Sequence, residues 1–502
     1  MIHKVFSVTH RGLDGHLVEI EAGISYEMPN FIIVGLPDAA VQEAKERVKH
    51  ALINSGFAFP KRRITINLAP ADIKKEGPAF DLALALSILM CSNQMSVDLS
   101  KSLFVGELAL DGSLRPTKGI LPAAIFAKKH GFGNIFVPPH NQDEAALVSG
   151  IKVIPVPDLK SVVNHLNQIS IINETLRTKV GQQKQEYDSD MKYVKGQDQA
   201  KRALEIAASG AHNILMSGPP GSGKTLLART LPTILPELSD EEILEVTKIY
   251  SIAGLLSREQ PVIKIRPFRA PHHSSSGVAL VGGGTNPKPG EISLAHRGIL
   301  FLDELPEFPR SALEHLRQPL EDGIIAISRA QGTFQYPARF ILVASQNPCP
   351  CGYATDPERE CTCSMNQRIQ YKKKISGPLL DRIDLHMEVP RVPIEKIQTD
   401  EEAESSATIR DRVKIAHDIQ HKRFEGLNIN YNSEMRPQDL NRFCELNHDT
   451  RKLLKQAAEK MHLTTRSYYR IIKLARTIAD LEQNQNIETK HIAEALQYRQ
   501  QS

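Results

Sequence analysis

The residue pattern with the clearest chemistry is a glycine-rich segment in the middle of the chain that ends in lysine and threonine. It fits the spacing GxxxxGK[ST], follows an apolar run at 214–216 and precedes a helical run at 226–231. In that context backbone N–H groups turn inward to hold phosphate oxygens, and the helix N-terminus adds a positive dipole end. We expect Lys224 to bind the β- and γ-phosphates of ATP and Thr225 to ligate Mg²⁺. The expected loop is Gly218, Pro219, Pro220, Gly221, Ser222, Gly223, Lys224 and Thr225.

Two carboxylates, Asp303 and Glu304, follow the apolar strand predicted at 298–302. Such a strand end is common by itself, but downstream of a phosphate loop it predicts the second half of an ATP site. We expect Asp303 to hold Mg²⁺ through water and Glu304 to act as the base that activates or positions the attacking water.

A third strand, predicted at 340–344, is followed by Asn347. A polar side chain at the end of a strand beside the nucleotide strand can reach the γ-phosphate or its attacking water. From the residues alone, an Asn-Pro turn explains Asn347 equally well.

Four cysteines lie within 15 positions: Cys349, Cys351, Cys361 and Cys363. Four thiolates can bind tetrahedral Zn²⁺, which would also fix a loop too polar to fold alone. The C-x-C spacing is less usual than C-x-x-C, so free thiols and a redox disulfide remain alternatives. We expect a structural zinc and no catalysis at this site.

The composition is that of a soluble globular protein with several domains: 502 residues, 41% hydrophobic, with a net charge of +4. Such a small net charge does not indicate a nucleic-acid partner, but a protein with a net charge near zero can still contain a basic channel. The N-terminus does not resemble a signal peptide, and the apolar run at 82–90 is too short to span a membrane. We therefore expect a cytoplasmic protein without membrane contact.

Periodicity divides the chain into an N-terminal α/β block at 1–172, a polar linker at 173–192, an α/β core at 193–393 and a helical region at 394–502. In the first block we predict strands at 31–35 and 63–68 and helices at 38–54 and 81–90. A strand–turn–strand pattern with glycine at the turn predicts a hairpin at 324–340.

Longer motifs carry a family resemblance. They are RPFRAPHHS at 266–274, ALVGGG at 279–284, PGEISLAHRG at 289–298, LDELPEF at 302–308 and LDRIDL at 380–385. Through these motifs, and over nearly its whole length, the chain resembles the ComM/YifB family of magnesium-chelatase-like AAA+ proteins. The resemblance implies a homo-hexameric ATPase and DNA helicase that promotes branch migration while incoming DNA is integrated in natural transformation.

The resemblance also implies further roles. Arg382 resembles the arginine finger that reaches a neighbouring subunit's ATP, and Arg466 resembles the second sensor arginine on the helical lid. A surface ion pair is the alternative for both Arg382 and Arg466, and Arg470, one turn later, competes with Arg466 for the sensor role. Insertions at 268–284 and 324–340 would line the central pore. The candidates for contact with single- and double-stranded DNA, without sequence preference, are Phe268, His272, His273 and Arg329.

The N-terminal block resembles the Lon-type protease domain, an α+β fold. Ala79 stands where that family has its serine, and Leu121 aligns with its catalytic lysine. Without a hydroxyl nucleophile and its base, the serine–lysine reaction is impossible, so we expect no peptidase activity. Basic residues here, including Lys75 and the run at 61–63, form a patch. We expect this patch to be a solvated face and not a DNA contact.

The leading hypothesis is therefore an ATP-driven DNA motor with an N-terminal Lon-protease-like domain, an AAA+ core and a C-terminal helical lid. Two alternatives are an AAA+ motor that remodels a protein or a chelatase-type partner, and a regulated ATP-binding scaffold. The scaffold is disfavoured because Lys224, Glu304 and Arg382 are all present. ATP, Mg²⁺ and structural Zn²⁺ are the expected cofactors.

Overall fold

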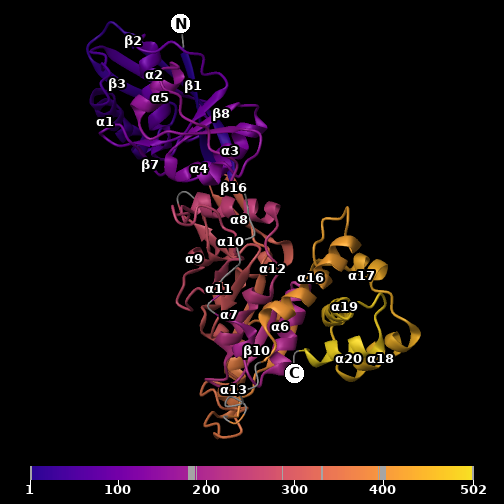
Figure 1. Ribbon diagram of the computed structural model, residues 1–502. Coiled ribbons are helices and arrows are strands. Elements are labelled where there is room, and N and C mark those ends of the chain that lie inside the picture. The colour runs from indigo at the N-terminus through magenta and orange to yellow at the C-terminus, as the bar shows by residue number, and fades with distance from the viewer. Residues whose placement is uncertain are drawn as a thin grey trace. The chain divides into compact units, whose positions relative to one another are not determined.

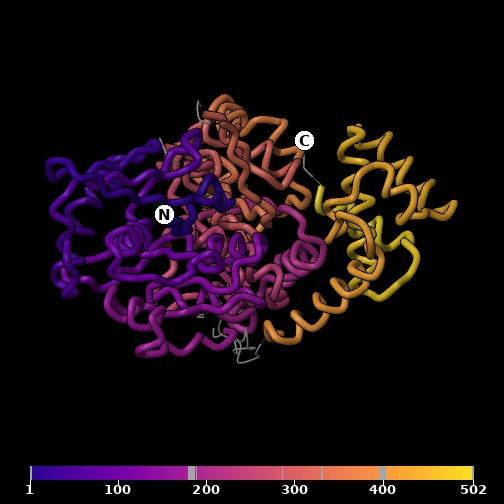
Figure 2. The backbone as a smooth tube through the Cα atoms, turned by 90° about the horizontal axis from the view of Figure 1, so that it is seen from above, coloured from indigo at the N-terminus to yellow at the C-terminus, as the bar shows by residue number. Residues whose placement is uncertain are grey.

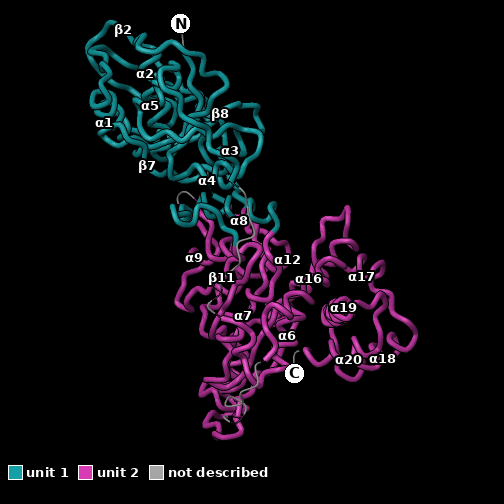
Figure 3. The backbone as a smooth tube through the Cα atoms, viewed as in Figure 1, with its two compact units in different colours: residues 1–183, 239–264, 328–335 teal, residues 184–238, 265–327, 336–502 magenta. Residues whose placement is uncertain are grey.

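The computed structural model describes residues 3–178, 187, 189–284, 287–329, 332–393, 395 and 403–499. Much of the predicted linker, at 179–186 and 188, lies outside the described residues, as do 330 and 331 at the turn of the predicted hairpin. Figure 3 shows two compact units, each built from separate stretches of chain. Unit 1 comprises Met1–Gln183, Ser239–Lys264 and Ser328–Gln335, and unit 2 comprises Lys184–Leu238, Ile265–Ile327 and Tyr336–Ser502.

Unit 1 is built on a seven-stranded mixed sheet in the order β3-β4-β2-β1-β5-β8-β9. The β1–β2 and β2–β4 pairs are antiparallel, and the other neighbours are parallel. Alternate residues of β4 are buried, as a strand with one covered face requires. The strands are β1 (His3–Arg11), β2 (Asp14–Ser25), β3 (Asn30–Val34), β4 (Arg63–Ala69), β5 (Ser102–Phe104), β8 (Asn134–Val137) and β9 (Lys152–Pro155), with a short pair β6 (Glu107–Leu108) and β7 (Leu114–Arg115).

The predicted elements of the N-terminal block are confirmed. Helix α1 begins after Asp38, whose side chain accepts from the Val41 N–H, and helix α2 is almost wholly buried. Lys75 departs from the expected solvated face, because its side chain is buried and its ammonium donates to the Pro70 carbonyl. The helices of unit 1 are α1 (Ala39–Asn54), α2 (Asp81–Cys91), α3 (Ile120–Lys129), α4 (Gln142–Ala145), α5 (Leu159–Leu166) and α8 (Asp240–Ala253).

Two segments from the middle of the chain complete unit 1. Helix α8 starts with a capping box between Ser239 and Glu242 and packs on α3. The predicted hairpin is confirmed as β15 (Ile324–Arg329) and β16 (Gly332–Pro337). Its far end belongs to unit 1, where the Arg11 guanidinium lies 5.7 Å from the centre of the Phe334 ring.

Unit 2 has a five-stranded sheet in the order β11-β14-β17-β10-β18, with every pair parallel. The central strands are continuous apolar runs that are buried on both faces, as parallel sheets require. The strands are β10 (Ile214–Ser217), β11 (Phe268–Arg269), β14 (Ile299–Leu302), β17 (Ile341–Gln346) and β18 (Leu385–Glu388), with a short pair β12 (Gly282–Gly283) and β13 (Lys288–Pro289).

Helices surround this sheet. They are α6 (Asp198–Gly210), α7 (Lys224–Ile234), α9 (Gly277–Val281), α10 (Glu291–Leu294), α11 (Arg310–Glu314), α12 (Arg317–Asp322), α13 (Met365–Lys372) and α14 (Gly377–Leu380). Single turns of 3-10 helix lie at Pro78–Phe80, Pro139–Asn141, Met191–Tyr193, Leu305–Glu307 and Asn432–Glu434.

The C-terminal part of unit 2 is helical, as predicted, and after β18 the described residues contain no further strand. Figures 1 and 2 both show these helices gathered beside the α/β core. One apolar core joins the two parts, since Val413 and Ile478 belong to the same buried cluster as Val343 of β17. The helices are α16 (Ser406–Arg423), α17 (Pro437–Phe443), α18 (His448–Lys460), α19 (Thr465–Leu481) and α20 (Thr489–Gln497).

Among the described helices of both units, none has the length and apolar character that crossing a membrane would need.

Candidate active site

The glycine-rich loop lies between β10 and α7, where its sequence pattern predicted it. Gly223 has a φ of 88°, which only glycine adopts without strain, and it immediately precedes the first residue of α7. The backbone therefore turns sharply from the strand into the helix, which leaves the first N–H groups of α7 without helical partners. Such a terminus is an anion site, and its position after a buried parallel strand suits phosphate.

Lys224 is buried at this turn. Its ammonium donates to the carbonyls of Gly218 (2.7 Å) and Pro219 (2.9 Å) and lies 3.4 Å from Asn347 Oδ1. Burial lowers the pKa of Lys224, while the nearby carboxylates of Asp303 and Glu304 oppose that shift. The ammonium is thus held by weak neutral acceptors, which phosphate oxygens could replace.

Asp303 connects the two halves of the site. The Thr225 hydroxyl donates to Asp303 Oδ2 at 3.1 Å, from the first turn of α7 to the end of β14. Neighbouring ligands of an octahedral Mg²⁺ ion with bonds of about 2.1 Å are separated by about 3 Å. The two oxygens therefore fit a site where Mg²⁺ contacts Thr225 directly and Asp303 directly or through water.

Ser345 belongs to this site by its contacts, although the sequence pattern did not indicate it. Its hydroxyl donates to Asp303 Oδ1 and accepts from the Glu304 N–H at 3.2 Å. Ser345 is fully buried on β17, one residue beyond the Leu302–Ala344 pair. In the sequence, its signal is only a serine that directly follows the apolar run at 340–344.

Glu304 is oriented by its backbone and by a histidine. Its φ of 54° is left-handed, and its carboxylate lies 3.7 Å from His273 Nδ1. The His272 and His273 rings lie side by side with centres 4.1 Å apart. Of the DNA candidates, His273 therefore faces the expected base. Phe268 instead packs within the fold as part of β11, with its ring centre 6.0 Å from that of Phe301.

The four cysteines converge, and the sulfur atoms of Cys349, Cys351 and Cys361 lie 3.4–3.5 Å apart in pairs. All four ligand atoms, including that of Cys363, lie within 4.8 Å of one another. These distances exceed a disulfide bond of about 2.05 Å and approach the separation of about 3.8 Å between sulfurs around a tetrahedral zinc. The pKa of Cys351 is lowered, chiefly by a hydrogen bond from the Tyr353 backbone, whereas the pKa values of its neighbours Cys349 and Cys363 are raised. The four thiols thus fit Zn²⁺.

Arg382 and Arg466 lie together, away from the glycine-rich loop of the same chain. Both pair with Glu321, Arg466 at 3.6 Å, on the wall of a cavity of about 910 Å³. The cavity is lined by Asn213, Gly298, Phe340 and Asp384, which immediately precede β10, β14, β17 and β18. It therefore opens at the amino ends of these strands, whereas the glycine-rich loop follows the carboxyl end of β10.

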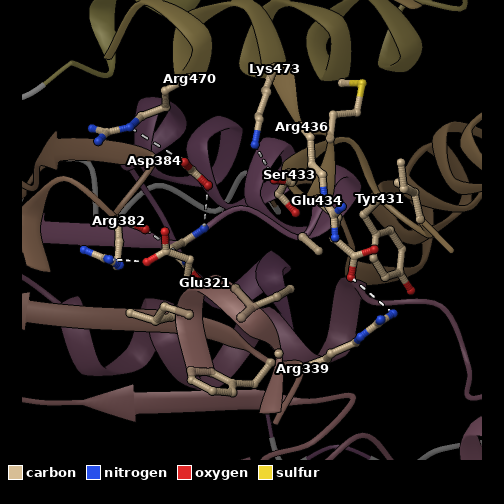
Figure 4. Close-up of a pocket in the computed structure, with 18 of the residues that line it drawn as sticks. Glu321, Arg339, Arg382, Asp384, Tyr431, Ser433, Glu434, Arg436, Arg470 and Lys473 are labelled. Carbon is tan, nitrogen blue, oxygen red and sulfur yellow. Dashed lines mark hydrogen bonds and ion pairs between the residues drawn. The ribbon is translucent and has the colours of Figure 1, made fainter. Parts of the chain in front are cut away.

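Figure 4 shows the surroundings of Arg470, one of the two competing arginines on α19. The Arg470 guanidinium turns toward Asp384, at 3.7 Å, and also donates to the Asp381 carbonyl. Its side chain is 8% exposed, whereas that of Arg466 is 51% exposed. Arg470 is thus committed to the packing of α19 on the core, which leaves Arg466 as the arginine that can reach a ligand.

Arg329 is exposed at the end of β15, beside the undescribed residues 330 and 331. Its place at the far end of the hairpin is compatible with the expected contact with DNA phosphates. Nothing else in the described residues near it marks a binding site.

Known proteins match nearly the whole chain. The profile "Magnesium chelatase, subunit ChlI" matches residues 190–397, "Subunit ChlI of Mg-chelatase" matches 20–141, and "Magnesium chelatase, subunit ChlI C-terminal" matches 403–499. Competence protein ComM of Haemophilus influenzae is 45% identical over 502 residues, which cover 99% of this chain and 97% of that protein. YifB of Escherichia coli is 42% identical over 490 residues, 97% of this chain and 95% of its own length. The magnesium-chelatase 38 kDa subunit of Cereibacter sphaeroides is 28% identical over 170 residues, 30% of this chain and 51% of that protein.

Proposed function

Since the chain belongs to the ComM/YifB family of magnesium-chelatase-like AAA+ ATPases, we propose that it is a hexameric, ATP-driven DNA motor. In this proposal it promotes branch migration while incoming DNA is integrated during natural transformation. The similarity to a competence protein over 99% of the chain supports a role in DNA uptake. The observation that carries the ATPase part is the contact of Thr225 and Ser345 with opposite oxygens of Asp303, because it joins the phosphate loop to the acidic strand.

Each residue of this site has a distinct task in hydrolysis. Lys224 exchanges its loop carbonyls for the β- and γ-phosphate oxygens of ATP, and Thr225 and Asp303 hold Mg²⁺. Bound Mg²⁺ supplies positive charge to the phosphate oxygens. Glu304 accepts a proton from the attacking water, and Asn347, whose amide lies beside Lys224, orients that water or the γ-phosphate.

The transition state of hydrolysis also needs positive charge near the γ-phosphate, and a neighbouring subunit supplies it. Arg382 and Arg466 lie at the amino ends of the strands, opposite the phosphate loop of their own chain. A four-residue strand such as β10 is about 13 Å long. Both arginines are therefore suited to a second copy's ATP, with Glu321 holding them until the phosphates arrive.

DNA contact is assigned to the insertions before β14 and β17. Arg329 is the candidate for phosphate contact, because it is exposed at the far end of the hairpin. His272 and His273 belong to the earlier insertion, and His273 also faces Glu304. A strand of DNA that displaces His273 would thereby reach the catalytic carboxylate, which gives a route for DNA to stimulate hydrolysis.

The test is steady-state ATPase activity with and without single-stranded, duplex and forked DNA at several salt concentrations. We expect strong stimulation that falls as salt rises, because phosphate contacts release counterions. Turnover without a response to any DNA would instead favour a motor that acts on protein or a chelatase-type partner. Absence of any turnover would reject the ATPase itself.

A further inference from the structure

The four-cysteine loop begins two residues after Asn347, so the same backbone carries an expected catalytic side chain and the first thiol. Cys349 is fully buried, and its carbonyl accepts from the Gly352 N–H at 3.0 Å, which closes a tight turn. The Cys351 N–H donates to Cys363 Sγ at 3.3 Å and ties the two C-x-C pairs together. This knuckle, which runs from Cys349 to Cys363, is thus a folded element that directly adjoins the candidate nucleotide site.

Gly352 lies against the phosphate loop. A Cβ atom there would be 2.6 Å from Pro220 Cδ and 2.7 Å from Pro220 Cγ, closer than real Cβ atoms come to their neighbours. The same atom would lie 3.9 Å from Asn347 Cγ. The turn from Cys349 to Gly352 therefore packs on Pro220 of the loop and lies close to the Asn347 amide beside Lys224.

The helix that follows the cysteine loop also reaches Asn347. After Cys363 the chain enters α13, which starts with a capping box between Ser364 and Gln367. Tyr371 near the end of this helix is mostly buried; burial raises its pKa to about 12, and a hydrogen bond with the Asn347 backbone opposes the shift. Asn347 is therefore contacted both by the turn at Gly352 and by the helix after Cys363.

We propose that the four-cysteine knuckle is a metal-held positioning element for ATP, whose metal occupancy sets the affinity of the phosphate loop for nucleotide. Without the metal, the four thiols lose the ion that they share, and the polar segment between Cys351 and Cys361 keeps only contacts such as the ion pair of Glu358 with Arg391 (2.7 Å) and the hydrogen bond from Arg359 to the Tyr353 hydroxyl. Gly352 then no longer supports Pro220, and the Lys224–Asn347 arrangement loosens. This inference rests on the proposed ATPase function, and Gly352 and Pro220 are its positioning residues.

The first experiment removes the metal from the full-length protein. Metal analysis of the purified protein should give about one zinc per chain. After zinc is stripped with a chelator under reducing conditions, affinity for a fluorescent ATP analogue with Mg²⁺ should fall about tenfold or more and return on zinc addition. Circular dichroism checks that the fold persists. Zinc-free, folded protein with unchanged ATP affinity would overturn the proposal, as would purified protein without metal.

The second experiment keeps the metal and changes the contact. Gly352→Ala should retain zinc but bind the ATP analogue about tenfold more weakly. Gly426→Ala is the matched control, because Gly426 also has a left-handed φ (+77°) but its Cβ would meet nothing within 4 Å. If the contact matters, Pro220→Ala and Gly352→Ala will be non-additive in a double-mutant cycle of ATP affinity. Equal ATP affinities for the Gly352→Ala and Gly426→Ala variants would refute the contact.

DNA binding separates this proposal from a nucleic-acid-binding knuckle. Affinity for single-stranded DNA, measured without nucleotide, should not change when zinc is removed. A loss of DNA affinity at unchanged ATP affinity would reject the positioning role. If the untreated protein binds no ATP at all, the proposed function fails first, which distinguishes that failure from the failure of this inference.

Discussion

Arg382 and Arg466 meet on one carboxylate, that of Glu321, although one precedes β18 and the other opens α19. The Glu321 carboxylate has its pKa lowered chiefly by the hydrogen bond with Arg382, so it is held in the charged form that pairs with both guanidinium groups. The pair lies at the amino ends of the parallel strands, where no phosphate loop of the same chain is near. In the proposed hexamer, these two arginines would act together on the ATP of a neighbouring subunit.

Arg382→Ala should bind ATP but lose about 10³-fold or more in turnover, because the transition-state charge loses its guanidinium. Mixing this variant with Lys224→Ala subunits, which keep Arg382, tests whether the arginine acts between subunits. Each variant alone should be inactive, and random mixed assemblies should recover roughly a quarter of the wild-type rate, since about one interface in four is complete. Lack of recovery in a mixture that demonstrably co-assembles would contradict action between subunits.

Lys224→Ala should abolish binding of ATP, because it removes the ammonium that lies beside the loop carbonyls and Asn347. Equilibrium binding of a fluorescent ATP analogue is the measurement, with circular dichroism as the check on folding. Retained ATP affinity would reject the phosphate-loop assignment.

Glu304→Gln should produce a stable ATP-bound oligomer without turnover, since glutamine keeps the shape of the side chain but cannot accept a proton. Nucleotide retained after gel filtration, together with phosphate release, gives both readouts. Hydrolysis at the wild-type rate would remove Glu304 from the catalytic role.

His273→Ala should raise DNA-independent hydrolysis and reduce the stimulation by DNA, because it frees the Glu304 carboxylate. The pair is half exposed and 3.7 Å apart, so its strength is at most about 1 kcal/mol, or about fivefold in rate. His272→Ala is the control, since the His272 ring bonds to Ser274 instead. Equal behaviour of the two variants would refute a specific His273–Glu304 link.

Glu144→Gln should change how the stability of unit 1 depends on pH. Burial raises the pKa of Glu144 from 4.5 to about 7, although Asn141 donates to its carboxylate at 2.6 Å. The folded state therefore holds the proton more tightly, and this stabilisation is complete below about pH 4.5 and is lost as the pH rises through 7. The shift corresponds to about 3 kcal/mol of unfolding free energy, which Glu144→Gln should no longer lose between pH 5 and 8. Urea unfolding checks this, and Asp143→Asn at the neighbouring, more exposed position should behave like wild type.

Local patterns predicted the elements that carry the candidate nucleotide site. The loop, the acidic strand and the hairpin each depend on residues close in sequence, where strand, turn and helix preferences agree. Asn347 could be chosen only with the family resemblance, because an Asn-Pro turn explains the sequence equally well. The structure adds the contact with Lys224 at 3.4 Å, although it does not test the catalytic role.

Contacts between residues that are far apart in the sequence could not be predicted from such local patterns. Ser345 contacts Asp303 because β14 and β17 are neighbours in a particular register, which the spacing in sequence does not specify. The position of Arg466 depends on how α19 packs on the core, and periodicity gives only which face of the helix is buried. The packing of Gly352 on Pro220 likewise depends on the path of an irregular loop.

Unit 1 consists of three separate stretches of chain, and this limits how the protein can be divided into fragments. A cut near residue 183 follows the chain but removes α8 and the far end of the hairpin from the N-terminal fragment. That fragment would expose the face of α3 on which α8 packs, and the remaining fragment would carry Phe334 without Arg11. Both fragments should therefore aggregate and express poorly. Short flexible bridges in place of Ser239–Lys264 and Ser328–Gln335 should instead keep the remaining AAA+ fragment soluble.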